Sequence, residues 1–226
     1  VAPAATGRIY AEIGGGVDTG LAIANPNDLA ADISFYFTNE AGVQVGQVGK
    51  LTLPANGKTA KFLSQDPFNG AAPFLGTLTY TSTLPVGITA LRGLTNSRNE
   101  FLITTIPVTP TSTSRNSTIL IPHFADGGAW KTQVILVNPT DASIGGTIRF
   151  LDNGTPAVEA AIISDTPYRI EPRSSFRLIT AGTSARTTSG SVRILPVAGQ
   201  AMPSTMTLFS YSRSGITVSE AGVAGA

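Results

Sequence analysis

His123 is the only histidine of the chain, so a Ser/His/Asp catalytic arrangement would have to use it as the general base. The Gly-x-Ser-x-Gly turn that presents a serine nucleophile in many hydrolases does not occur in the sequence. With one histidine and no cysteine, the chain also lacks the usual ligands of a zinc site. We therefore expect His123 to be structural, and we assign no catalytic residue, no cofactor-binding residue and no metal ligand.

Other candidate chemistry also has a simpler structural explanation. Paired carboxylates are the signature of glycoside hydrolases, but the only close pair in residues 1–110 is Asp28 and Asp32, which lie in a predicted turn and at a predicted strand start. Oxygen ligands in residues 152–155 (Asp-Asn-Gly-Thr) could hold calcium, although an Asn-Gly hairpin turn explains the same residues. The glycines at 14–16 lack the following helix and lysine of a phosphate loop, so they predict a flexible loop between strands.

Aromatic side chains offer the one candidate ligand site. Trp130, together with Tyr168 or Tyr211, could form a platform on which a sugar ring stacks. The alternative is that Trp130, which follows a glycine-rich loop, covers one end of a hydrophobic core. These three residues are the possible ligand platform, and a polysaccharide is the possible ligand.

Composition excludes several classes of partner. Charged residues make up only 13% of the chain and the net charge is +1, so there is no basic footprint for nucleic acid. No apolar stretch approaches the roughly 18 residues of a membrane span. A surface with so little charge is unusual for a protein that stays apart from its neighbours, and it fits one that is covered by them. We therefore expect a homo-oligomer or polymer.

The positions that carry these candidates belong to two related stretches of sequence. Residues 19–28 (TGLAIANPND) read like residues 132–141 (TQVILVNPTD), and both Asn25 and Asn138, and Phe37 and Phe150, are 113 positions apart. Between the two stretches lies a segment rich in Pro, Thr and Ser, which is typical of a linker. The predicted organisation is a first repeat at 1–108, a linker at 109–117 and a second repeat at 118–226.

Each repeat has the pattern of β-strands. Ile33, Phe35 and Phe37 alternate with smaller or more polar residues, and Ile148 and Phe150 do the same in the second repeat. Glycine, proline and Asn-Gly pairs interrupt the runs at hairpin spacing and exclude long helices. The sequence therefore predicts an all-β fold of two tandem Ig-like antiparallel β-sandwich domains with about seven strands each. In this fold we expect Asn25 and Asn138 to end a strand, and Asp28 and Asp141 to bond the turn that follows.

The chain also resembles a tandem β-sandwich repeat of large secreted or cell-surface bacterial proteins, mostly of unassigned function. The resemblance covers nearly the whole chain and is carried by these segments: residues 121–132 (IPHFADGGAWKT), 137–141 (VNPTD), 173–176 (RSSF), 216–223 (ITVSEAGV), 90–92 (ALR) and 98–105 (RNEFLITT). It implies an extracellular location and brings no catalytic residues. The start VAPAA, which could be a mature terminus left after signal cleavage, leads to the same expectation.

These observations together predict a non-enzymatic, extracellular structural or adhesive protein. The expected role is a self-assembling subunit of a surface filament or layer, in which a terminal tail could add as a strand to a neighbouring subunit. The alternative is a carbohydrate-binding module that uses Trp130.

Overall fold

The structure is a computed structural model that describes residues 2–111 and 118–225, so most of the predicted linker lies outside the described residues. Every regular element in the described ranges is a β-strand, and every strand pairing there is antiparallel. The prediction of an all-β, antiparallel fold is thus confirmed. No helix among these residues could cross a membrane.

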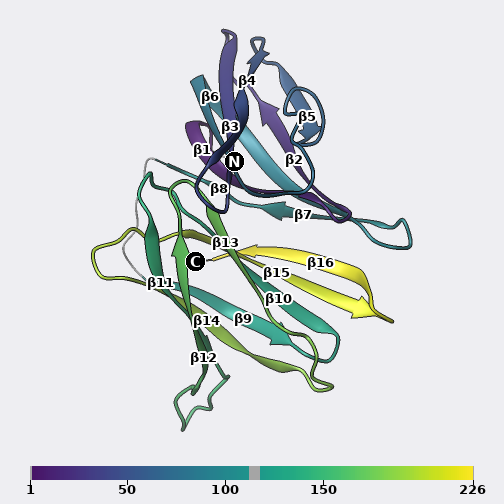
Figure 1. Cartoon of the computed structure of the whole chain (residues 1–226), viewed down its shortest axis with the longest axis vertical. Helices are drawn as coiled ribbons and strands as arrows, with labels where there is room; N and C mark the ends of the chain where they lie inside the picture. Colours follow the sequence, from purple (N-terminus) through teal and green to yellow (C-terminus); the bar gives the residue numbers. More distant parts are fainter. Residues whose placement is uncertain (1, 112–117, 226) are drawn as a thin grey trace.

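The first half of the chain, drawn in purple to teal in Figure 1, forms one sheet around a very long strand. Its strands are β1 (Ala4–Gly14), β2 (Val17–Ala24), β3 (Ala31–Asn39), β4 (Gln44–Leu53), β5 (Lys58–Phe62), β6 (Phe74–Thr95), β7 (Phe101–Ile106) and β8 (Val108–Thr109). The start of β6 pairs with β1 and β3, whereas its end pairs with β2 and β7. The strands therefore form two groups, β4-β3-β6-β1 and β5-β2-β6-β7, which share β6.

The second half has the same order of strand pairing in two separate sheets. Its strands are β9 (Ile119–Asp126), β10 (Trp130–Val137), β11 (Ile144–Leu151), β12 (Ile162–Ile170), β13 (Ser175–Ile179), β14 (Thr188–Pro196), β15 (Ser204–Arg213) and β16 (Ile216–Ala224). The sheets have the orders β12-β11-β14-β9 and β13-β10-β15-β16. Here β14 and β15 take the places of the two parts of β6.

Glycine determines the turn between β1 and β2. Gly15 and Gly16 form a two-residue hairpin turn with φ angles of 62° and 84°, and positive φ at both positions matches the twist of the flanking strands. A Cβ atom on Gly16 would lie 2.5 Å from the carbonyl oxygen of Thr95. The glycine run is therefore a connection between strands, as expected, but it is a tight turn and not a flexible loop.

The Asn-Pro turns are held by the asparagines rather than by the aspartates that follow them. Buried Asn138 donates from Nδ2 to the carbonyl oxygens of Ala142, Ile170 and Glu171, and Asn25 donates in the same way to Leu29, Leu53 and Pro54. The expectation that Asp141 bonds this turn was wrong, because its side chain is exposed and lies near guanidinium groups instead. A buried amide can supply several hydrogen bonds without the cost of burying a charge.

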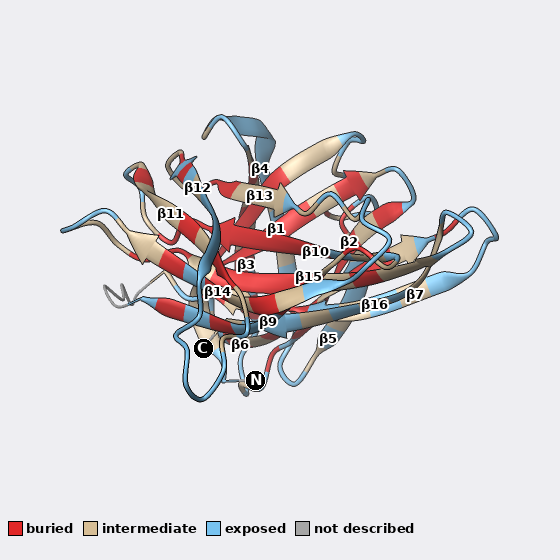
Figure 2. Cartoon of the chain, turned by 90° about the horizontal axis from the view of Figure 1, so that it is seen from below, coloured by how far each residue is buried: buried red, intermediate tan, exposed pale blue. Residues whose placement is uncertain are grey.

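The two halves are joined through β10, which is buried on both faces. Ile135 and Val137 belong to the core of the first half, while Val134 and Leu136 belong to the core of the second half. Met206 and Leu208 of β15 also join the first core. Figure 2 shows these buried strands crossing the middle of the molecule beside β1, with exposed residues at its ends. The sheet β13-β10-β15-β16 is thus an internal layer between the two cores.

Candidate functional site

A groove with aromatic residues in its walls lies between the edge strands of the two sheets of the second half. It has a volume of about 520 Å³, and its lining includes His123, Ala125, Trp130, Phe209, Ser219 and Ala221. These residues come from β9, β10, β15 and β16. We call this surface the aromatic groove. It lies on the open side of the sandwich, because β9 and β16 each end their sheet.

Two aromatic pairs build this region. Trp130 and Tyr211 are direct partners across β10 and β15, and their ring centroids are 4.9 Å apart. His123 stacks on Phe209 with a centroid distance of 5.7 Å and an angle of 24° between the rings. The lining of the groove also includes Thr187, Ser189 and Ser219. Such a surface can stack on a flat apolar ligand or pack against another protein.

The structure brings together only two of the three predicted platform residues. Trp130 and Tyr211 lie side by side, but Tyr168 is buried in the second core, with its ring 6.4 Å from that of Phe176. Burial raises the pKa of Tyr168 to about 12. Tyr168 therefore packs in the core of the second half. His123 and Phe209, and not Tyr168, line the groove together with Trp130.

Residues 152–155 begin a longer loop between β11 and β12 instead of the predicted Asn-Gly hairpin turn, and Asp152 makes hydrogen bonds within this loop. Its Oδ1 accepts hydrogen bonds from the backbone N–H groups of Gly154 at 3.0 Å and Ala161 at 2.8 Å. The described residues contain no group of three or more histidine or acidic side chains placed to hold a metal ion. This carboxylate closes a loop between β11 and β12.

A buried ionic cluster lies where the first half meets the second. Arg92 of β6 pairs with Glu12 of β1 at 3.3 Å and with Glu220 of β16, and Arg177 of β13 donates to Glu12 at 2.8 Å. The Tyr10 hydroxyl donates to Glu12 at 3.2 Å. Two carboxylates and two guanidinium groups balance in charge, so the cluster can be buried. It links strands from both halves and acts as a polar lock between them.

Burial dominates the electrostatics of this lock. Burial raises the pKa of Glu220 above its usual value, although the neighbouring Arg92 acts in the opposite direction. Burial also raises the pKa of Tyr10, which cannot lose its proton at any physiological pH. A small pocket of about 270 Å³ reaches Glu12 and Arg177. Each carboxylate in the cluster is nevertheless engaged by a guanidinium group, which favours a structural role over acid–base chemistry.

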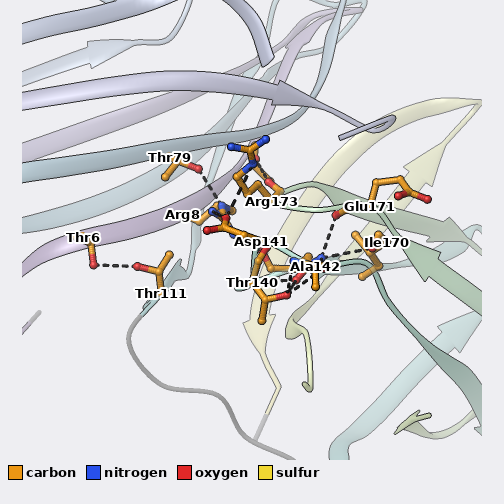
Figure 3. A network of polar contacts seen from close by, with 12 residues as sticks. Thr6, Arg8, Thr79, Thr111, Thr140, Asp141, Ala142, Ile170, Glu171 and Arg173 are labelled. Carbon is orange, nitrogen blue, oxygen red and sulfur yellow. Dashed lines mark hydrogen bonds and ion pairs between the residues drawn. The ribbon is translucent and has the colours of Figure 1, made fainter. Parts of the chain in front are cut away.

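Arg8 provides a second contact between the halves, shown in Figure 3. Its side chain is buried and donates to Thr79 Oγ1 at 2.8 Å and to the carbonyl oxygen of Asn138 at 2.6 Å. Its guanidinium also lies 3.7 Å from the exposed carboxylate of Asp141. Burial lowers the pKa of Arg8, and the group nevertheless stays charged at neutral pH. Arg8 therefore ties β1 to the Asn-Pro turn of the second half.

Sequence reasoning missed these junction residues. The signal was a charged residue within an otherwise apolar strand run, as at Arg8 and Arg92, together with the preference for arginine over lysine in the second half. Arginine is typical of buried ion pairs and interfaces. The pattern indicates that the residue is buried with a partner, but nothing in the sequence pairs Arg92 with Glu220.

Comparison with known proteins assigns this chain to no family. No family model matches the sequence, and no curated protein matches it. The crystal structure of Thermotoga maritima 1070 is similar to part of the chain, with a TM-score of 0.40 and 18% sequence identity over 47% of this chain and 93% of that chain. A similarity at this level assigns no function to the chain.

Proposed function

We propose that this chain is a non-enzymatic, extracellular structural or adhesive protein that self-assembles into a surface filament or layer. In this proposal the two halves are homologous Ig-like β-sandwiches. The observation that carries it is the internal layer β13-β10-β15-β16, whose central strand β10 is buried on both faces and contributes to the cores of both halves. A fold that already stacks one sandwich on another provides a unit for longer stacks.

The charge distribution supports this role. Only 13% of the residues are charged, and several of the charged groups are used inside the molecule, in the lock of Glu12, Arg92, Arg177 and Glu220. This leaves fewer charges to keep separate molecules apart, because like-charge repulsion is what keeps many proteins monomeric.

Strand exchange through a tail is one route to such an assembly. In this structure β1 pairs with β6 and β16 pairs with β15, so both tails already belong to sheets of their own chain. Exchange would require one of these strands to leave its partner. Deleting residues 216–225 removes β16 and should abolish assembly if the exchanged strand is C-terminal.

The test of self-assembly is electron microscopy and sedimentation velocity on the intact protein from about 1 µM to about 1 mM, which spans the affinities expected of weak to moderate contacts. Growth of filaments or sheets with concentration is expected. A protein that stays monomeric over the whole range would contradict the proposed assembly.

Carbohydrate binding is the second candidate function, and the partly exposed aromatic pairs at the groove favour it. It predicts that a panel of bacterial polysaccharides contains a ligand and that Trp130→Ala removes its binding. Phe101→Ala, which alters an exposed aromatic residue of the first half, is the matched control and should leave binding unchanged. A panel without any ligand for the wild type would exclude this candidate.

A further inference from the structure

The aromatic groove of the second half has a counterpart in the first half, and that counterpart is occupied. The strand registers give the equivalence: Thr19 lies opposite Arg92 as Thr132 lies opposite Phe209, and Arg92 lies opposite Thr104 as Phe209 lies opposite Ala221. Arg92 is thus the counterpart of Phe209, and Thr104 the counterpart of Ala221.

Two threonine hydroxyl groups show that β1 of the first half is equivalent to β9 of the second half. Thr19 Oγ1 bonds the backbone N–H and carbonyl of Glu12, and Thr132 Oγ1 bonds the same groups of Ala125. Glu12 is therefore the counterpart of Ala125. By the pairing of β1 and β9 with β6 and β14, Tyr10 is the counterpart of the bulge that contains His123.

In the first half, residues of the second half fill this site. Arg177 of β13 bonds Glu12, Glu220 of β16 pairs with Arg92, and the backbone N–H of Gly222 donates to Thr104 Oγ1 at 2.7 Å. The sheet β13-β10-β15-β16 is therefore the element that occupies the groove of the preceding sandwich. In the second half the same groove is open.

The sheet that would fill the open groove also exists in the chain. The counterpart of β13-β10-β15-β16 is the group β5-β2-β6-β7 of the first half. Its outer face is exposed where the second-half face is buried: Ala24 and Pro26 are exposed, whereas Val137 and Pro139 are buried. We call this outer face of β5-β2-β6-β7 the open face.

The two free surfaces have complementary chemistry at the first ionic contact of the junction. Where the internal junction has Glu220 against Arg92, the open face has Ile103 and the groove has Phe209. At these positions the junction has two oppositely charged side chains, whereas the open face and the groove each have an apolar side chain. The change at one side alone would leave a buried charge without a partner, which is strongly unfavourable.

The second ionic contact of the junction shows the same exchange. Where the junction has Arg177 against Glu12, the register of β5 with β2 gives Ala60 on the open face, and the groove has Ala125. These two ionic contacts thus both have apolar counterparts in the free surfaces, whereas the contact of Arg8 with Asp141 has Leu120 and the exposed Asp28 as its counterparts.

The shapes of the two surfaces also agree. The open face has Ala22 and Ala24 where the junction has Ile135 and Val137, and a depression of about 620 Å³ lies over these small residues. The groove is bulkier than the equivalent site of the first half, because Trp130 stands where the first half has Val17. A large side chain on one surface and a hollow on the other are what close packing requires.

We infer that the aromatic groove of one molecule binds the open face of a second copy of this chain, in the arrangement that the two halves already have within one molecule. This inference rests on the proposed self-assembly and names its interface. Groove and open face are different surfaces, so the contact is heterologous and leaves a free groove and a free open face at the ends of every oligomer. Such contacts build open fibres unless the rotation closes them into a ring.

The decisive test transfers the junction's own ion pair to the new interface. Phe209→Arg in the groove places a charge against Ile103, and Ile103→Glu on the open face places a charge against Phe209, so each variant alone should lose self-association by about tenfold or more. A mixture of the two should assemble again, with strict alternation, because the introduced arginine then meets the introduced glutamate as Arg92 meets Glu220. Sedimentation velocity and electron microscopy measure both effects.

Ile162→Glu is the matched control. Ile162 is 53% exposed and Ile103 is 51% exposed, but Ile162 lies on β12, at the other edge of the sheet from β9. This control should assemble like the wild type. Far-ultraviolet circular dichroism and urea unfolding of all variants establish that a lost assembly is not a lost fold.

Cross-linking gives a second readout, and the absence of cysteine from the sequence makes its background low. Gly222 and Thr104 are in contact at the junction, and their counterparts are Thr105 and Ala221. Two single variants, Thr105→Cys and Ala221→Cys, should form a disulfide-linked heterodimer when mixed. A mixture of Lys50→Cys and Ala221→Cys, in which Lys50 lies on the edge strand β4, should not.

The outcomes separate this interface from the proposed function. Wild-type polymers that persist in both single variants would overturn the groove-to-face contact and leave self-assembly standing. A wild type that never associates would overturn both. A monomer whose groove binds a polysaccharide, with binding lost in Trp130→Ala, would assign the groove to a glycan instead of a second copy.

Discussion

At the scale of single residues, the strongest determinants are polar groups buried with complete sets of partners. Asn25 and Asn138 each organise an Asn-Pro turn, and Arg8, Arg92 and Glu220 hold the two halves together. The common reason is that a buried polar group stabilises a structure only when its partners are present and costs free energy when they are removed. Predictions at this scale therefore concern the loss of one partner.

Asn138→Ala should lower the free energy of unfolding by about 3 kcal/mol, because it leaves buried carbonyl groups without a donor. Its Nδ2 donates to three carbonyl oxygens, and its Oδ1 accepts from the backbone N–H and the hydroxyl of Thr140. Urea unfolding measures the change. Asp28→Ala, at an exposed position of the equivalent turn, should stay within about 0.5 kcal/mol of the wild type. Equal effects would show that the asparagine does not hold the turn.

Glu220 gives a pH dependence of known sign. Its pKa in the folded protein is raised, so above about pH 4.5 the folded state binds more protons than the unfolded state, and stability falls as the pH rises through the folded pKa. Relative to Glu220→Gln, the wild type should thus lose unfolding free energy as the pH increases over this window. Urea unfolding at a series of pH values checks it.

Glu171 is the control of opposite sign for this pH series. Hydrogen bonds from Ser143 and Arg169 lower its pKa, so its contribution to stability is lost as the pH falls through the folded pKa. Relative to Glu171→Gln, the wild type should therefore lose stability on acidification. The same slope for both variants would refute the assignment of the Glu220 pKa to burial.

At the scale of elements, β10 is the central strand of the molecule. Consecutive residues Val134, Ile135, Leu136 and Val137 are all buried, since alternate side chains enter different cores. A continuous apolar run is typical of a strand that is covered on both faces. The equivalent run in β2 alternates Leu21 and Ile23 with the alanines at 22 and 24, in keeping with one covered face.

Ile135→Ala tests whether β10 supports the first half as well as its own. Its side chain is fully buried in the first core, so the substitution should cost about 2–5 kcal/mol of unfolding free energy. Ile103→Ala, which truncates a half-exposed isoleucine of β7, should cost within about 0.5 kcal/mol. Thermal and urea unfolding measure both. A small effect at Ile135 would mean that the halves do not share a core.

At the scale of the whole molecule, the two halves should unfold together. The first core contains residues of β10 and β15, and the ionic lock spans both halves, so neither half keeps its contacts when the other unfolds. Trp130 is the only tryptophan and reports on the second half, whereas circular dichroism reports on all strands. The two signals should follow a single urea transition. A second transition without a change in tryptophan fluorescence would show that the first half is independent.

The all-β class was predictable from the sequence, because side chains of a strand alternate with period two and glycine, proline and Asn-Gly pairs interrupt the runs. The recurrence of the Asn-Pro turn was predictable in the same way, since both copies keep the residues that make its local hydrogen bonds. Of the three candidate platform residues, Trp130 and Tyr211 lie side by side, whereas Tyr168 is buried by core packing that no local pattern encodes.

Residue types along the chain by themselves determined the strands and the turns, because these depend on interactions within a few positions. The composition by itself determined the low content of charged residues. Only the tertiary structure decided that β10 faces two cores, that Arg92 meets Glu220, and that the groove filled in one half is open in the other. These are contacts between residues more than a hundred positions apart, and sequence patterning sets which side of a strand is apolar but not which surface covers it.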